Sequence, residues 1–369
     1  MNKVETRARI IAFHLPQFHP VAENDQWWGR GFTEWTNVSR ARPQFPGHDQ
    51  PRLPGDLGYY DLRVPEAREK QASLARGHGV EAFCYWHYWF GGKRLLGRPV
   101  DEILQSGQPD FPFCLAWANE SWSRRWLGEE RDILIKQTYS HEDDLQHARW
   151  LAKVFSDPRY LRVQGRPVFL IYRPGELPEP KRTIAALRAA CAAQGLPEPF
   201  LLGILAHFHS DCRKLGLDGS VDFEPQLGVL VNSLTEGLKV FEYASARKLM
   251  TSRKRTFPFY PCIFVGWDNT PRRGANAIVI KDSTPELFGA GLQEIVEAAQ
   301  CKPYDDRLVF VNAWNEWAEG NYLEPDRKRG RAFLEVIRDV NCGRGRSASK
   351  GRKARLQKTG PSTKEIVGS

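Results

Sequence analysis

Eight short apolar runs, each ending in polar or aromatic residues, limit what this chain can fold into more than any other feature. Their length is that of a strand, and none approaches the roughly eighteen apolar residues of a membrane-spanning helix. The runs are Arg9–His14, Glu81–Trp86, Phe111–Trp117, Pro167–Tyr172, Phe200–Ala206, Val221–Glu224, Tyr260–Val265 and Leu308–Ala313. The spacing of these runs predicts eight strands distributed along the whole chain.

Segments of helical character separate most of the predicted strands. They include Pro65–His78, His141–Phe155, Pro180–Gln194 and Pro285–Gln300, and Arg329–Val340 follows the last strand. Strands that alternate with helices indicate a parallel sheet with crossover connections. A single (β/α)8 TIM barrel over residues 1–342 of the 369 agrees best with the strand number and the length. An open doubly wound sheet is the alternative.

The ends of the predicted strands carry the candidate binding residues. In a (β/α)8 barrel the active site lies at the carboxyl ends of the strands. Here these ends are polar and aromatic, and of the 12 tryptophans only Trp150 lies in a predicted helix. This clustering predicts a long aromatic-lined cleft, with the loop from Pro16 to Asp61 covering one side. The expected substrate-binding residues are His14, Gln17, Trp28, Trp35, His87, Trp89, Trp117, Asn119, Glu120, Trp267, Asn315 and Trp317.

Two carboxylates follow the last predicted strand and are the candidate catalytic residues. Glu316 and Glu319 would face opposite sides of a continuing strand, but they can face one pocket from a turn, which Gly320 favours. Two such acids among aromatic side chains are typical of chemistry at a glycosidic bond. Carboxyls about 5 Å apart fit a retaining reaction, and a gap of roughly 6.5 to 9.5 Å fits direct attack by water. An ordinary acidic turn paired with Arg327 or Lys328 is the alternative.

Metal and nucleotide signatures are weak or missing. His207 and His209 lie on one face of a strand, but spacing marks no further ligands, so substrate hydrogen bonding or a structural role is expected and no required metal is predicted. No GxGxxG follows a strand and no GxxxxGK[ST] occurs, so no cofactor is predicted. No Asp-x-Asp for a nucleotide-sugar diphosphate follows a strand either. Glu120 is expected to bind sugar hydroxyls or to pair with Arg124 or Arg125.

Most of the net charge of +9 lies in the last 27 residues. The segment 343–369 contains eight Lys or Arg residues and one acid, Glu365, and it lacks aromatic residues. It is predicted to be a disordered basic tail, solvated or in peripheral contact with an anionic inner-membrane surface, with no specific nucleic acid partner. The seven cysteines form no CxxC, and the N-terminus has no signal-peptide pattern. A cytoplasmic protein is therefore expected.

Several long motifs carry a family resemblance. They are HLPQFHP (14–20), NDQWWGRGFTEWTNV (24–38), DLGYYDLR (56–63), CYWHYWF (84–90), LAWANESWSRRW (115–126) and WNEWAEGNYLEP (314–325). With these motifs in this order, the chain from Ile10 to about Val340 resembles the WbsX-like family of bacterial surface-polysaccharide proteins. The domain of that family is related to family-99 glycoside hydrolases, which are endo-α-mannosidase-like.

The resemblance implies a fold and a mechanism. It implies a (β/α)8 barrel acting on α-mannose-type linkages, in which Glu319 is the acid/base on the glycosidic oxygen. Glu316 would assist the sugar's own 2-hydroxyl as internal nucleophile, through an anhydro-sugar intermediate. The sequence departs from the hydrolases at Ala318, where they have a histidine, and at Asn321.

Residues and resemblance together predict a carbohydrate-active enzyme. The expected reaction occurs at glycosidic bonds of a bacterial surface polysaccharide of the O-antigen or lipopolysaccharide type, with mannose- or rhamnose-like sugar and retention of configuration. One alternative is a lipopolysaccharide glycosyltransferase that uses a nucleotide-sugar donor in the same cleft. A second alternative is a non-catalytic glycan-binding barrel. The expected partner in the first two cases is an oligosaccharide or polysaccharide.

Overall fold

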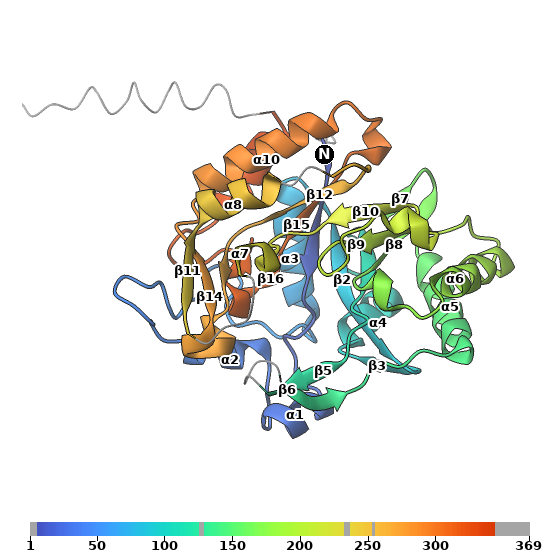
Figure 1. The fold of residues 1–369 in the computed structure, drawn as a ribbon, viewed down its shortest axis with the longest axis horizontal. Coiled ribbons are helices and arrows are strands. Elements are labelled where there is room, and N and C mark those ends of the chain that lie inside the picture. The colour runs from blue at the N-terminus through green and yellow to red at the C-terminus, as the bar shows by residue number, and fades with distance from the viewer. Residues whose placement is uncertain (1–5, 125–128, 232–236, 253–254, 344–369) are drawn as a thin grey trace, which may run out of the picture.

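The computed structural model describes residues 6–124, 129–231, 237–252 and 255–343, without the side chains of 124 and 129–131. Eight parallel strands form a closed barrel in the order in which they occur along the chain (Figure 1). They are β1 (Arg9–His14), β2 (Val80–Phe90), β4 (Phe113–Trp117), β8 (Arg166–Ile171), β9 (Phe200–Ile204), β10 (Gly219–Asp222), β12 (Tyr260–Phe264) and β15 (Leu308–Asn312). The barrel closes where β1 pairs with both β2 and β15, with Ile10 opposite Val309. The predicted (β/α)8 barrel is confirmed.

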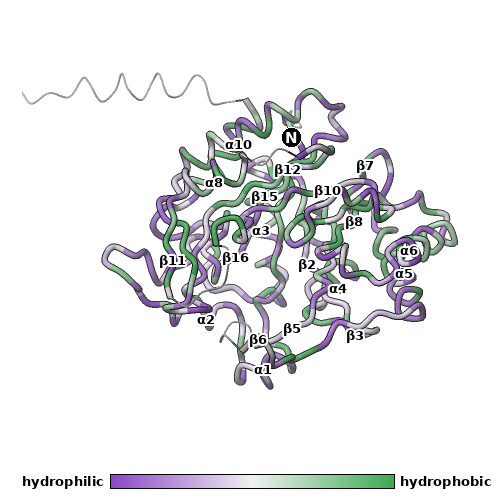
Figure 2. Tube along the Cα trace, viewed as in Figure 1, coloured by the Kyte–Doolittle hydropathy of each residue, from purple (hydrophilic) through white to green (hydrophobic). Residues whose placement is uncertain are grey.

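The barrel strands form where the sequence is apolar on both faces. Every residue of β1, β4 and β15 is buried, which is typical of parallel strands covered by helices. Figure 2 shows hydrophobic residues along the central strands β12 and β15, and a mixture of both colours on the outer helix α10. The hydrophobic core therefore lies inside the barrel and between the barrel and its helices.

Helices on the outside connect most of the strands. They are α3 (Pro65–Gly77), α4 (Arg98–Ser106), α5 (His141–Phe155), α6 (Pro180–Ala193), α8 (Tyr243–Thr251), α10 (Pro285–Ala299) and α11 (Ala332–Asn341). Local sequence sets where they begin: the Ser140 and Thr284 side chains accept hydrogen bonds from the first turns of α5 and α10. The connection from β9 to β10 has only a 3-10 turn, Cys212–Leu215. None of the described helices is long and apolar enough to cross a membrane.

Short elements are added to the barrel, many of them in the loops that follow its strands. The short helices are α1 (Ala22–Trp28), α2 (Glu34–Arg40), α7 (Leu227–Leu230) and α9 (Thr270–Arg273). The short strands are β3 (Lys93–Leu95), β5 (Trp122–Arg124), β6 (Glu129–Ile135), β7 (Arg162–Val163), β11 (Lys239–Glu242), β13 (Trp267–Asp268), β14 (Ile278–Lys281), β16 (Asn315–Glu316) and β17 (Asn321–Tyr322). Several of these elements supply the walls of the cavity described below.

A buried aspartate ties the long first loop to the other end of the chain. Asp268 Oδ2 accepts hydrogen bonds from His48 (2.9 Å) and Gln50 (2.7 Å). Arg52 donates to the carbonyl of Gly320 at 2.9 Å. Burial acts to raise the pKa of Asp268, but the His48 hydrogen bond and the Arg52 charge lower it to about 2. The loop that was expected to cover one side of the cleft is thus fixed against the turn that follows β15.

The predicted basic tail begins at the edge of the described part of the chain. Residues 344–369 lie outside it, so the tail's disorder, its membrane contact and the boundary at 342 remain predictions. The seven cysteines are all free thiols.

Candidate functional site

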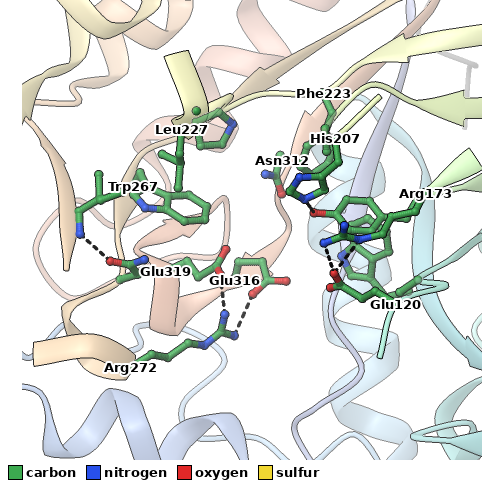
Figure 3. Close-up of a pocket in the computed structure, with 18 of the residues that line it drawn as sticks. Glu120, Arg173, His207, Phe223, Leu227, Trp267, Arg272, Asn312, Glu316 and Glu319 are labelled. Carbon is green, nitrogen blue, oxygen red and sulfur yellow. Dashed lines mark hydrogen bonds and ion pairs between the residues drawn. The ribbon is translucent and has the colours of Figure 1, made fainter. Parts of the chain in front are cut away.

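A cavity of about 1010 Å³ lies at the carboxyl ends of the barrel strands. Of the residues expected in the site, Gln17, Trp28, Glu120, Trp267, Glu316 and Glu319 line it. Figure 3 shows its acids in two groups, one around Arg272 and the other beside Arg173. Predicted residues from the first part of the chain, such as Gln17 and Trp28, and from its last part, Glu316 and Glu319, therefore line the same cavity.

A tight turn presents Glu316 and Glu319 to the same cavity. Strand β16 ends at Glu316 and pairs with β17 in antiparallel fashion, and a 3-10 turn over Trp317–Glu319 joins them. Gly320 ends this turn with φ 58°, and an added Cβ there would lie 2.8 Å from both Arg52 and Asp268. Glycine is thus required at this position. The expected turn is confirmed, and the acids share a pocket.

Arg272 is the partner of both acids. Its Nη1 donates to Glu319 Oε1 at 2.5 Å and its Nη2 to Glu316 Oε2 at 3.3 Å. Arg272 comes from α9, more than forty residues before the pair. It is Arg272, and not Arg327 or Lys328, that forms the ion pairs with the two acids. The pairing with Arg327 or Lys328 that the alternative predicted is therefore wrong, because the partner of both acids is Arg272.

A third carboxylate completes the group around Arg272. Glu34, at the start of α2, accepts from Arg272 Nε at 2.9 Å and has a fully buried side chain. Burial acts to lower the pKa of Arg272, but the charges of Glu34, Glu319 and Glu316 raise it above its usual value. One guanidinium is therefore surrounded by three carboxyl groups.

The electrostatics of this group favour a shared proton on the acid pair. Burial raises the pKa of Glu316, the charge of Glu319 raises it further, and Arg272 opposes both effects. Burial also raises the pKa of Glu319, again against Arg272, with Glu34 adding to the increase. A single cation does not balance three buried negative charges, so Glu316 and Glu319 together retain a proton at neutral pH. One acid and one base at close range can serve proton transfer in both directions.

The second polar group lies across the cavity. Glu120 Oε2 accepts from Arg173 Nε at 2.8 Å and from Nη2 at 2.5 Å, and Arg173 Nη1 donates to Glu176 at 2.6 Å. All three residues line the cavity. Glu120 thus has an arginine partner and faces the cavity as well. Of the partners expected for Glu120, the side chain of Arg124 and the whole of Arg125 lie outside the described residues.

Aromatic side chains line the cavity alongside the two polar groups. Trp86 and Tyr172 are in edge-to-face contact at 5.3 Å, and Phe223 packs against both. The Tyr172 hydroxyl lies 3.2 Å from His207 Nε2. Together with Trp267 these rings add an apolar lining to the polar groups of the cavity, which suits the C–H faces and hydroxyl edges of sugar rings.

Residues of β2 alternate between the cavity and the surrounding helices. Trp86 and Tyr88 line the cavity, whereas His87 and Trp89 contact His147 of α5. His87 Nε2 lies 2.9 Å from His147 Nε2, and the Trp89 ring stacks on His147 at 4.5 Å. The expectation that His87 and Trp89 contact substrate is not supported by this placement, because successive strand residues face opposite sides.

The same alternation continues after β4. Ala118 and Glu120 line the cavity, whereas Trp117 and Asn119 are buried outside it. Trp117 packs edge-to-face on His147. Asn119 Nδ2 donates to the carbonyl of Arg173 at 3.0 Å. The structure thus gives Trp117 and Asn119 packing and loop-fixing contacts in place of the expected cavity position.

The remaining expected binding residues are also buried behind the cavity wall. Asn315 is fully buried, accepts from the Leu15 backbone N–H at 2.7 Å and donates to its carbonyl at 3.0 Å. His14 Nε2 lies 3.3 Å from Gln71 Oε1. His14 and Asn315 do not reach the cavity, whereas their neighbours Leu15 and Glu316 do.

Two tryptophans of this inner layer hold the turn from behind. Trp317 Nε1 donates to Glu324 Oε2 at 2.6 Å, and Trp35 Nε1 donates to the carbonyl of Tyr60 at 2.8 Å. The Tyr60 hydroxyl in turn donates to Glu324 at 3.0 Å. Burial raises the pKa of Glu324 to about 7, although these hydrogen bonds oppose the rise. Trp35 and Trp317 therefore support the site without lining it.

The buried histidine pair beside α5 should make the fold sensitive to acid. Burial lowers the pKa of His147 to about 3 and also lowers that of His87. The unfolded chain binds these protons below about pH 6.5 and the folded chain does not, so stability should fall by about 1.4 kcal/mol per pH unit per histidine. Urea unfolding between pH 7 and 5 measures this slope. It should decrease in His147→Asn and stay unchanged in His141→Gln, at an exposed position; equal slopes in both variants would contradict the account.

Several cavity residues were not expected from the sequence. Arg272 lies in an unremarkable Thr-Pro-Arg-Arg run, and nothing marks which arginine faces the pair. Trp86 and Tyr88 lie within a run of aromatic residues whose two faces look alike in sequence. Glu34, which is buried behind the cavity lining, belongs to the motif NDQWWGRGFTEWTNV (24–38), but only its contact with Arg272, distant in sequence, reveals a role.

The described residues contain no group of three or more His, Cys, Asp or Glu side chains arranged to hold a metal ion. His207 and His209 both line the cavity. That the reaction needs no metal or cofactor stays a prediction.

The sequence matches one family and two proteins of greater length. The family model described as Glycosyltransferase WbsX covers residues 10–337. Two proteins named Uncharacterized protein WxcX, from Xanthomonas campestris pv. campestris strains B100 and ATCC 33913, are each 44% identical over 344 residues. The matched region covers 90% of this chain and 49% of each relative. The chain therefore spans about half the length of the curated relatives it matches.

Solved structures share the barrel at low sequence identity. The GH99 endo-alpha-mannosidase from Bacteroides thetaiotaomicron has a TM-score of 0.56 and 16% identity, over 94% of this chain and 98% of that one. A structure titled glycoside hydrolase-like protein has a TM-score of 0.55 and 13% identity, over 92% and 95%. At this identity the similarity concerns the fold alone.

Proposed function

The chain belongs to the WbsX glycosyltransferase family, whose members are carbohydrate-active enzymes, and we propose that it acts at glycosidic bonds of a bacterial surface polysaccharide. The reaction takes place at Glu316 and Glu319 and retains the configuration of the sugar. Its substrate is a mannose- or rhamnose-like glycan held along the cavity. The observation that carries this proposal is a buried acid pair that faces the cavity and shares one arginine.

The proton balance of the pair fits such a reaction. Glu319 gives a proton to the glycosidic oxygen while the bond from that oxygen to C1 breaks. Glu316 removes the proton of the 2-hydroxyl, whose oxygen bonds to C1 and forms a 1,2-anhydro sugar. An acceptor hydroxyl then opens this ring at C1, its proton passes to Glu319, and O2 regains a proton from Glu316. Two inversions at C1 give net retention.

Arg272 has a defined part in this cycle. The pair holds one proton in total throughout the cycle: in the first step Glu319 loses a proton and Glu316 gains one, and in the second step the reverse occurs. Arg272 contacts both acids, so it can follow the negative charge from one to the other without leaving its position. The low dielectric of the buried site strengthens this effect.

The far wall supports binding of an extended glycan. Glu120 and Arg173 offer charged hydrogen-bonding groups, while Trp86, Tyr172 and Phe223 offer apolar ring faces. The cavity of about 1010 Å³ exceeds the volume of a single sugar ring. A sugar on this wall would place the next linkage over the acid pair.

The acceptor in the second step decides between two reactions. Water gives a hydrolase, and a sugar hydroxyl gives a transferase, which agrees with the name of the matching family. A transferase would form its bond from an activated donor such as a nucleotide sugar in the same cavity. Both reactions use the same carboxyl groups.

Product analysis tests the proposal. The purified protein is incubated with mannan- and rhamnan-like oligosaccharides, with and without nucleotide sugars, and the products are identified by mass spectrometry and NMR. We expect new saccharide products from the wild type and almost none from Glu319→Gln. Equal turnover by the two proteins would refute the role of the pair, and glycan binding without any product in both would indicate a binding barrel.

A further inference from the structure

Glu34 is a buried carboxylate that the proposed reaction does not use. Its side chain is fully buried, and it lies some 280 residues before the acid pair in sequence. We propose that Glu34 is a positioning residue, which fixes Arg272 in the orientation where its guanidinium contacts Glu316 and Glu319 together. The inference rests on the proposed function of that pair and identifies what holds the pair's cation in place.

The three donors of Arg272 go to three different acids. Nε donates to Glu34 at 2.9 Å, Nη1 to Glu319 at 2.5 Å and Nη2 to Glu316 at 3.3 Å. A guanidinium is planar, so fixing the direction of Nε also fixes where the two terminal nitrogens point. Without an acceptor at Nε, the group could rotate and form a two-point contact with one acid of the pair. Glu34 prevents this by occupying the third donor.

Glu34 is itself held from two sides. Gln17 Nε2 donates to Glu34 Oε2 at 2.8 Å, and the Glu34 backbone N–H donates to the Gln17 carbonyl at 2.9 Å. Asn37 approaches Glu34 Oε1 at 3.5 Å. These contacts join the loop after β1 to α2, so that the carboxylate has little freedom. A fixed acid of this kind can orient the arginine that it binds.

The charged groups around Glu34 come from several elements. Arg272 belongs to α9, Glu316 to β16 and Glu319 to the following turn, and Tyr88 of β2 also faces this group. Glu120, across the cavity, adds its charge to the field at Glu319. The negative charge of Glu34 raises the pKa of both Glu316 and Glu319, and Arg272 lowers both. Glu34 thus has two opposite effects on the pKa values of the pair. Its own charge raises them, and the Arg272 that it holds in place lowers them.

Two variants separate these effects. Glu34→Gln removes the charge but keeps an acceptor for Arg272 Nε, and Glu34→Met removes both. The carboxyl titration of Glu316 and Glu319 is followed by ¹³C NMR of protein labelled at the glutamate carboxyl carbon, with signals assigned from Glu316→Gln and Glu319→Gln. We expect the midpoint of the pair to fall by about 1 pH unit in Glu34→Gln, because a like charge is lost. In Glu34→Met it should lie about 1 pH unit above that of Glu34→Gln, because Arg272 is no longer held.

The comparison of the two variants decides the inference. Equal midpoints in Glu34→Gln and Glu34→Met would mean that Glu34 acts by charge alone and would overturn it. Asp157→Asn is the matched control, since Asp157 pairs with Arg159 away from the cavity and should leave the midpoint unchanged. If Glu34→Met does not fold, Gln17→Met replaces it: the charge of Glu34 stays, its orientation is lost, and the midpoint should rise above that of the wild type. An unchanged midpoint would then count against the inference.

The titration needs no substrate, so its outcome is separate from that of the proposed function. If Glu319→Gln turned over glycans as well as the wild type does, the proposed function would fail while the titration could still succeed. If Glu319→Gln were inactive and the Glu34 variants titrated alike, the positioning role alone would fail.

Discussion

Replacing Glu319 by glutamine should lower kcat/KM on an unactivated oligosaccharide by about 10²- to 10⁴-fold, the usual contribution of a general acid. Much of this loss should return on a substrate with an aryl leaving group, because such a group departs without a proton. Replacing Glu316 by glutamine should be as harmful on both substrates, because the 2-hydroxyl still has to lose its proton. Steady-state kinetics of the two variants on both substrates measure this difference.

The resting contacts make the comparison informative. Arg272 lies closer to Glu319 (2.5 Å) than to Glu316 (3.3 Å), which favours the proton on Glu316 in the resting protein, so the proposed cycle requires this proton to move to Glu319 when substrate binds. If the aryl leaving group rescued Glu316→Gln instead of Glu319→Gln, the two roles would be exchanged. Glu335→Gln, on the exposed side of α11, serves as the control and should retain the activity of the wild type.

Replacing Arg272 by methionine should destabilise the protein by about 3–5 kcal/mol at pH 8, the usual cost of removing one partner from a buried ionic group. Glu34, Glu316 and Glu319 would then have no cation among them. The pKa values of Glu316 and Glu319 in the folded state, which burial already raises, would rise further above those of the unfolded chain. Such a rise destabilises the fold progressively as pH increases above about 4.5, so the deficit should be smaller at pH 5 than at pH 8.

Urea unfolding of Arg272→Met and the wild type at both pH values provides the measurement. Arg213→Met is a suitable comparison, because Arg213 pairs with Asp211 at the surface, where such pairs contribute little. Arg213→Met should unfold like the wild type at both pH values. A deficit of Arg272→Met that is the same at pH 5 and pH 8 would mean that packing, not charge, accounts for the loss.

The barrel was predictable because its signal repeats along the chain. Runs such as Leu308–Ala313 are apolar on every face, and each is short enough to be a strand. A strand that is apolar on every face is stable mainly in a parallel sheet whose two faces are both covered. The turn after β15 was predictable for a similar reason, since Gly320 and the two spaced acids favour a bend over a continuing strand.

The orientation of strand-end residues was not predictable in the same way. The run Tyr85–Phe90 is aromatic on both faces, so its sequence does not tell whether Trp86 or His87 points inward. A shift of one residue exchanges the two faces of a strand. This one-residue ambiguity accounts for the misplaced His87, Trp89, Trp117 and Asn119. Arg272 was missed for another reason: its partners are distant in sequence, and an isolated arginine carries no pattern.

Hydrogen bonds of Asn341 join the segment before β1 to the end of α11. This contact determines where another protein domain can be fused to the barrel. The Arg7 backbone N–H donates to the Asn341 carbonyl at 2.8 Å, and the Asn341 side chain bonds both the N–H and the carbonyl of Ala8. The entry to β1 and the exit from α11 therefore meet at the amino ends of the strands, whereas the cavity opens at the carboxyl ends. A protein module fused at either point would extend from the rear of the barrel and leave the mouth clear for a polymer. Joining the two points by a short linker would likewise allow the chain to be reopened elsewhere, as a circular permutant, with its acid pair in place.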